Sequence, residues 1–106
     1  MVMACLVSFG AAASSHTVAE CFEGSDFIGN AAMARDNGVS RAAFLDRLEE
    51  DLAMIRAYPP ALRWFAKDAA DERLLQDAAA EVFDAPRRPD VHRARFLEIC
   101  FGTTTI

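Results

Sequence analysis

The side chains with the greatest capacity for covalent, metal or acid–base chemistry are three cysteines and two histidines. Cys5 and His16 lie in the first 19 residues, and Cys21, His92 and Cys100 lie in the remainder. A thiolate metal site needs closely spaced ligands such as Cys-x-x-Cys, and the same motif marks many thiol redox sites. Neither cysteine of the remainder has such spacing or a histidine close to it in the sequence. The sequence therefore predicts no metal site, redox site or cofactor.

His92 is the one candidate for acid–base catalysis in residues 20–106. It lies beside Arg93 and Arg95, with no serine, cysteine or carboxylate around it in a known catalytic motif. A lone histidine of this kind is typical of a solvent-exposed position, and general acid–base chemistry needs a positioned partner. We therefore predict a surface role for His92, no catalytic residue and no enzymatic activity. A small hydrolase that uses His92 with carboxylates is the weaker alternative.

The first 19 residues have the composition of a secretory signal peptide. An apolar run, MVMACLVSFGAAA, is followed by the polar stretch SSHTVA, and no charged residue precedes Glu20. The run is too short to span a bilayer. Small residues at Thr17 and Ala19 predict cleavage after Ala19, and cleavage after Ala13 is the alternative. No basic residue precedes the run, which leaves a first core helix in an unprocessed chain as the other interpretation. We expect a signal peptide at 1–19, one domain at 20–106, and a periplasmic or secreted location.

Export would leave two cysteines, one near each end of the domain. An even number of cysteines in an oxidising compartment indicates a disulfide, here between Cys21 and Cys100. It would close a loop of about 80 residues, for which chain entropy gives roughly 4.5 kcal/mol as an upper figure. That is comparable with the whole stability of a small domain.

Charge and composition restrict the partners. The formal net charge is −5, from 16 acidic and 11 basic residues, without a cluster of lysine or arginine. Nucleic-acid binding requires several neutralised phosphates, so we predict no nucleic-acid partner. An acidic surface equally argues against docking on an anionic membrane, and we expect no stable membrane insertion of the mature chain.

Apolar residues recur at spacings of three and four, and no useful strand alternation appears. We predict an all-α fold, a small bundle of four to five short helices closed by one disulfide. Ser25, Ser40, Asp68 or Asp71, and Asp90 are the expected N-caps. Asn37-Gly38 and Tyr58-Pro59-Pro60 are expected to end helices, a short helix is expected to reach about Lys67, and GTTTI reads as a tail.

The stretch ARDNG combines a charged pair with a turn signal. Arg35 and Asp36 at a helix end are expected to form a capping or inter-helix ion pair, and Gly38 is expected to take the left-handed conformation. We interpret these three residues as structural.

Several short motifs together resemble a group of small exported two-cysteine helical proteins of Gram-negative bacteria. The pattern is C…ARDxG…V[FY]xxP…C, and its residues here are Cys21, Ala34, Arg35, Asp36, Gly38, Val82, Phe83, Pro86 and Cys100. The resemblance covers nearly all of residues 20–106 and supports export and the crosslink. The group has no assigned activity, so the resemblance implies no function. Phe83 stands where a tyrosine is common.

The leading functional hypothesis is a non-enzymatic module that binds another protein, whose identity the sequence does not indicate. A second hypothesis is an acid-stress chaperone-like protein, because 16 carboxylates and a crosslinked unfolded state suit a bundle that loosens at low pH. The small hydrolase is the third.

Overall fold

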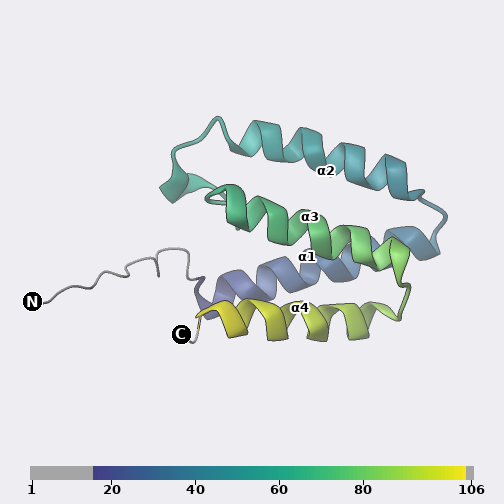
Figure 1. The fold of residues 1–106 in the computed structure, drawn as a ribbon. Helices are drawn as coiled ribbons and strands as arrows, with labels where there is room; N and C mark the ends of the chain where they lie inside the picture. The colour runs from purple at the N-terminus through teal and green to yellow at the C-terminus, as the bar shows by residue number, and fades with distance from the viewer. Residues whose placement is uncertain (1–15, 105–106) are drawn as a thin grey trace, which may run out of the picture.

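This computed structural model describes residues 16–104, which contain four α-helices (Figure 1). They are α1 (Val18–Asp36), α2 (Arg41–Ile55), α3 (Ala69–Asp84) and α4 (Pro89–Thr104), and a 3-10 turn, η3 (Pro60–Leu62), lies between α2 and α3. None of these residues forms a strand. The prediction of an all-α bundle is therefore confirmed. No helix of this described part has both the length and the apolar composition needed to cross a membrane.

The helix α1 is the centre of the bundle. It packs most extensively against α4 and also contacts α3, which in turn supports α2. α1 and α4 run antiparallel, so the beginning of α1 lies beside the end of α4 (Figure 1). Residues from all four helices and from the segment before α3 form one buried core: Ile28, Ala31, Ala32, Leu48, Leu52, Phe65, Leu75, Ala79, Val82 and Phe96.

Two glycines allow the close approach of α1 and α4. A Cβ atom on Gly24 would lie 2.6 Å from the ring of Phe96, and one on Gly29 would lie 2.4 Å from the guanidinium of Arg93. Both distances are shorter than van der Waals contact, so a side chain at either position requires a neighbour to move. Small residues at these two positions therefore permit the observed packing of α1 against α4.

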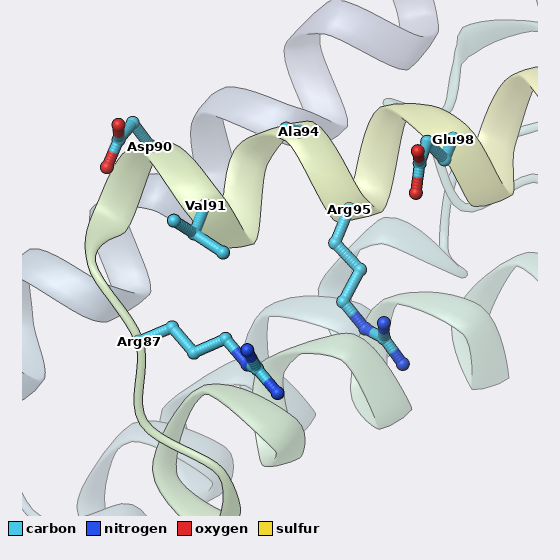
Figure 2. Close-up of a pocket in the computed structure, with 6 residues that line it drawn as sticks. All are labelled: Arg87, Asp90, Val91, Ala94, Arg95 and Glu98. Atoms are coloured by element: carbon cyan, nitrogen blue, oxygen red, sulfur yellow. The ribbon is translucent and has the colours of Figure 1, made fainter.

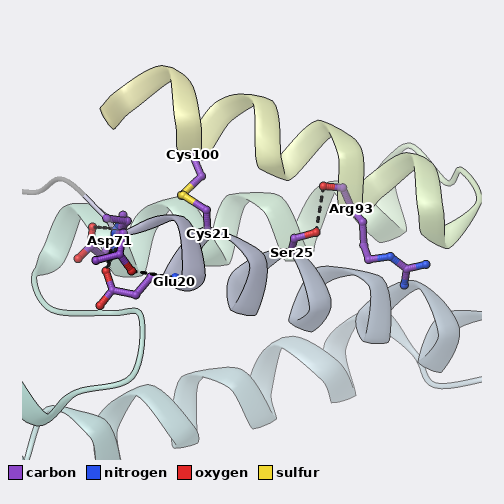
Figure 3. The surroundings of a disulfide bond; sticks show 8 residues. Glu20, Cys21, Ser25, Asp71, Arg93 and Cys100 are labelled. Carbon is purple, nitrogen blue, oxygen red and sulfur yellow. Dashed lines mark hydrogen bonds and ion pairs between the residues drawn. A yellow bond between two sulfur atoms is a disulfide. The ribbon is translucent and has the colours of Figure 1, made fainter. Parts of the chain in front are cut away.

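The beginning of α1 differs from the expectation. Thr17 is the N-cap: its hydroxyl accepts from the backbone N–H of Glu20, and the Glu20 carboxylate accepts from the backbone N–H of Thr17, a complete capping box. The predicted cap, Ser25, lies inside the helix instead, where its hydroxyl donates to the carbonyl of Arg93 at 3.2 Å (Figure 3). The prediction was wrong because it placed residues 16–19 in the leader and so left Thr17 out of the domain.

Other helix ends follow the sequence signals. Gly38 has φ of +97°, and the backbone N–H groups of Gly38 and Val39 donate to Arg35 and Ala34 in a Schellman motif. Ser40 caps α2 by accepting from the N–H of Ala43 at 3.1 Å. Of the two caps weighed for α3, Asp68 is the one observed.

Three expected boundaries were wrong. The short helix predicted to about Lys67 is only the three-residue turn η3. α4 begins at Pro89, so Asp90 lies in its first turn rather than at the cap. Proline suits this first position because its missing N–H would have no helical partner there. α4 also continues to Thr104 through residues read as a tail, and the contact of Phe101 with Phe22 (ring centroids 6.0 Å apart) extends its packing to the last turn.

Candidate functional site

A disulfide bond joins Cys21, near the beginning of α1, to Cys100, near the end of α4 (Figure 3). The two sulfur atoms are 2.02 Å apart, the Cα atoms are 5.8 Å apart, and both residues are fully buried. The predicted pairing is confirmed. Among residues 16–104, no three histidine, cysteine or acidic side chains come together in a way that would hold a metal ion.

His16 is part of the core, although the sequence analysis placed it in the leader. Its side chain is 2% exposed, and its Nε2 lies 2.8 Å from Oδ1 of Asp71. Its ring stacks on Phe65 with centroids 4.1 Å apart and planes 8° apart. The other carboxylate oxygen of Asp71 accepts from the backbone N–H of Lys67 at 3.0 Å. His16 therefore connects the start of α1 to α3 and to the segment that precedes it.

Glu20 makes a second connection at the same end of the bundle. Its Oε2 accepts from Nζ of Lys67 at 2.6 Å, while its Oε1 accepts from Thr17. The hydrogen bond from Lys67 is the largest influence and holds the pKa of Glu20 below its ordinary value of 4.5, although partial burial opposes it. Lys67 thus contacts the first turn of α1 through both Glu20 and, by way of Asp71, His16.

Arg35 joins α1 to the opposite end of the bundle. Its Nη1 donates to the carbonyl of Val82 at 2.8 Å, and its Nη2 donates to the carbonyl of Arg87 at 2.7 Å. The Val82 carbonyl lacks a helical partner because residue 86 is proline and has no N–H. Arg35 supplies that missing donor. We call this set of contacts the Arg35 latch.

The predicted Arg35–Asp36 ion pair is present, with Nη2 and Oδ1 2.9 Å apart, but it joins neighbours within α1. The contacts between helices are made instead by the Arg35 guanidinium to backbone carbonyls. Gly38 completes the arrangement by ending α1 one turn beyond Arg35. The sequence pointed to all three residues but not to the acceptors of Arg35. Every residue has a backbone carbonyl, so residue type does not indicate which carbonyls accept.

His92 lies beside the latch and is 3% exposed, so the prediction of a surface position was wrong. Its Nε2 accepts from the backbone N–H of Arg87 at 2.9 Å and lies 3.4 Å from Nη1 of Arg35. An Nε2 that accepts must be unprotonated. Burial first, and then the positive charge of Arg35, lower the pKa of His92 below its ordinary value of 6.5, while Glu81 acts in the other direction. The structure thus favours neutral His92.

A surface segment between residues 54 and 62 presents three large apolar side chains. Met54 is 68% exposed, Tyr58 is 57% exposed and Leu62 is 71% exposed. Met54 lies in the last turn of α2, Tyr58 lies in the connection that follows, and Leu62 ends η3. Figure 1 shows the path from α2 through η3 to α3. We call this the 54–62 surface.

Arg63 holds the backbone of the 54–62 surface in place. Its guanidinium donates to the carbonyls of Tyr58 at 2.8 Å, Lys67 at 3.1 Å and Arg56 at 3.2 Å. Pro59 and Pro60 further restrict the chain between these contacts. The sequence predicted only a helix break in this segment. The signal that marks it is the combination of two prolines with apolar residues that have no place in a helix stripe.

An open groove of about 400 Å³ lies along α4 (Figure 2), lined by Arg87, Asp90, Val91, Ala94, Arg95 and Glu98. The side chains of Arg87 and Arg95 extend from it towards α3. Arg95 pairs with Glu81 at 2.8 Å, and Asp90 pairs with Arg88 at 3.0 Å. Because these charges are balanced locally, the groove does not define a site for an ionic ligand.

No protein-family model, curated protein or solved structure matches the chain. The resemblance to small exported two-cysteine proteins therefore stays a prediction.

Proposed function

We propose that the protein works outside the cytoplasm, in the periplasm or as a secreted protein, as a non-enzymatic module that binds another protein. The observation that carries this proposal is the 54–62 surface. Exposed apolar side chains are common when scattered, but three in the ordered stretch from 54 to 62 favour a contact surface. The buried disulfide supports the location, since such bonds persist in oxidising compartments.

The fixed backbone of the 54–62 surface favours recognition. A loop that is already ordered loses little conformational freedom on binding, which leaves more of the contact free energy as affinity. Here the guanidinium of Arg63 orders the loop, because it donates to three backbone carbonyls. Tyrosine and methionine are also enriched at the centres of protein interfaces.

The neighbouring charge indicates the chemistry of the partner. Asp46 and Glu50 on α2 are exposed, and the chain as a whole is acidic. Complementary charge at the rim of an interface speeds association and excludes wrong partners. The partner we expect therefore presents an apolar segment flanked by basic residues.

Site-specific photocrosslinking in the periplasm tests the proposal. A photoreactive phenylalanine analogue in place of Tyr58 should form a defined adduct with one protein, and the same analogue in place of Met33 should not. Met33 is a matched control because it is also exposed, at 49%, but lies on α1. Leu62→Glu should abolish the adduct at position 58, whereas Met33→Glu should leave it. Equal adducts from both positions, or none from either, would contradict a binding role for this surface.

A second candidate function, an acid-stress chaperone-like protein, is favoured by the position of His92. Protonation of its Nε2 removes the acceptor for the Arg87 N–H and places a second positive charge 3.4 Å from Arg35. Acid would therefore weaken the junction of α1, α3 and α4 and loosen the apolar core. Suppression of client aggregation at about pH 3 but not at about pH 7 would support this function. Equal suppression at both, or none at either, would exclude it.

A further inference from the structure

The contacts of His16 and Thr17 bear on where a leader could be removed. His16 has one of the least exposed side chains at this end of the bundle. It contacts Phe65 and Asp71, which lie far along the chain from it. Thr17 provides the cap on which the first turn of α1 depends. Both residues lie before Ala19, so cleavage after Ala19 would remove them.

Loss of residues 16 and 17 would remove contacts from several groups. The Asp71 carboxylate, 6% exposed, would lose the nitrogen 2.8 Å away, and one face of Phe65 would lose the ring stacked on it. The backbone N–H of Glu20 would lose its acceptor and become part of a new terminus. A new α-ammonium group at Glu20 would also lie at the positive end of the helix dipole, where a cation is unfavourable.

We propose that signal peptidase cuts the chain between Ala13 and Ser14, so that the mature protein begins at Ser14 and keeps His16 and Thr17. The inference rests on the proposed extracytoplasmic location. The peptidase hydrolyses one amide bond with one water, which leaves a carboxylate on Ala13 and an amino group on Ser14. Ala11 and Ala13 provide the Ala-x-Ala pattern that this class of enzyme accepts, and they end the apolar run.

The peptide bond after Ala19, the other candidate for cleavage, is part of helix α1 in the folded protein. It lies within the first turn of α1, and the side chain of Ala19 is exposed. A larger residue at position 19 would therefore fit the folded structure without a clash. This makes Ala19 the matched control for Ala13, because both are the alanine before a candidate bond.

The test is the intact mass and N-terminal sequence of the full chain after expression in a Gram-negative host, in periplasmic and cytoplasmic fractions. The expected periplasmic product begins at Ser14 and has two hydrogens fewer than the reduced chain because of the disulfide. Ala13→Leu should cause the precursor to accumulate, and Ala19→Leu should give the Ser14 product unchanged.

Each alternative product has its own meaning. A mature chain that begins at Glu20, or processing that is blocked by Ala19→Leu, would overturn the Ser14 assignment while leaving the location intact. An uncleaved chain in the periplasm would also overturn it. An uncleaved chain confined to the cytoplasm would overturn both the assignment and the proposed location.

Discussion

Nη1 of Arg35 lies 3.4 Å from Nε2 of His92, so a permanent positive charge faces the nitrogen that would take up a proton. The same nitrogen accepts from the Arg87 backbone. Neutral His92 thus completes the junction where α1 meets the end of α3 and the start of α4. The contact gives this junction a dependence on pH that the disulfide at the other end does not share.

The first prediction concerns mildly acidic solution. The pKa of His92 is lowered in the folded state, so as pH falls the unfolded chain takes up the proton first. The stability that His92 contributes is fully present above its ordinary pKa of 6.5 and is lost as pH falls towards the lowered value. Urea unfolding with the disulfide intact should show a smaller free energy of unfolding at about pH 5 than at about pH 7.5.

The control is His92→Gln, whose side-chain oxygen can replace Nε2 as an acceptor but does not titrate. Its free energy of unfolding should change less between the two pH values than that of the unsubstituted protein. Both pH values lie above 4.5, the ordinary pKa of Glu20. The pKa of Glu20 is lowered in the folded protein, so this group affects stability only in stronger acid. Equal pH dependence in the two proteins would assign the effect to other groups.

The second prediction concerns the Arg35 latch. Arg35→Lys keeps the charge but cannot donate to Val82 and Arg87 together, because an ammonium lacks the planar fork of a guanidinium. We expect a loss of about 1–3 kcal/mol in the free energy of unfolding. Thermal unfolding followed by circular dichroism would measure it.

Arg88→Lys is the matched control for the latch. Arg88 is 80% exposed in its side chain and pairs only with exposed Asp90 among the described contacts, so its replacement should change the melting temperature little. A similar fall in both variants would show that the Arg35 contacts to the carbonyls contribute no special stability.

The third prediction concerns the close packing of α1 and α4. Gly24→Ala adds a Cβ atom 2.6 Å from the Phe96 ring and 3.2 Å from the Phe65 ring, so we expect a destabilisation of about 1–3 kcal/mol. Gly102→Ala, in the last turn of α4, meets nothing within 4 Å and should stabilise the helix by up to about 1 kcal/mol. Chemical unfolding of both variants would measure the difference. Stabilisation by Gly24→Ala would contradict the close helix approach.

Local signals in the sequence predicted the features that depend on neighbouring residues. Gly38 ends α1, and Ser40 and Asp68 cap α2 and α3, because each acts within three or four positions of itself. The pairing of Cys21 with Cys100 was also predictable, since only two cysteines lie beyond the apolar run.

Features that depend on distant backbone atoms were not predictable in this way. His92 is buried and accepts from the backbone N–H of Arg87. Arg35 donates to the carbonyls of Val82 and Arg87, which lie far from it in the sequence. His16 was assigned to a leader from its neighbours in sequence, whereas its partners are Phe65 and Asp71. A backbone group that lacks a partner, such as the Val82 carbonyl before Pro86, is the nearest sequence-level signal for such contacts.

The position of the disulfide also determines how the protein would respond to mechanical force. It links residue 21 to residue 100, so tension applied to the two ends of the chain passes directly through the sulfur–sulfur bond. The residues between them, which include most of the helical core, lie outside that load path. Pulling on the termini would therefore load only the residues outside the crosslink, and the enclosed helices would stay folded until the bond is reduced.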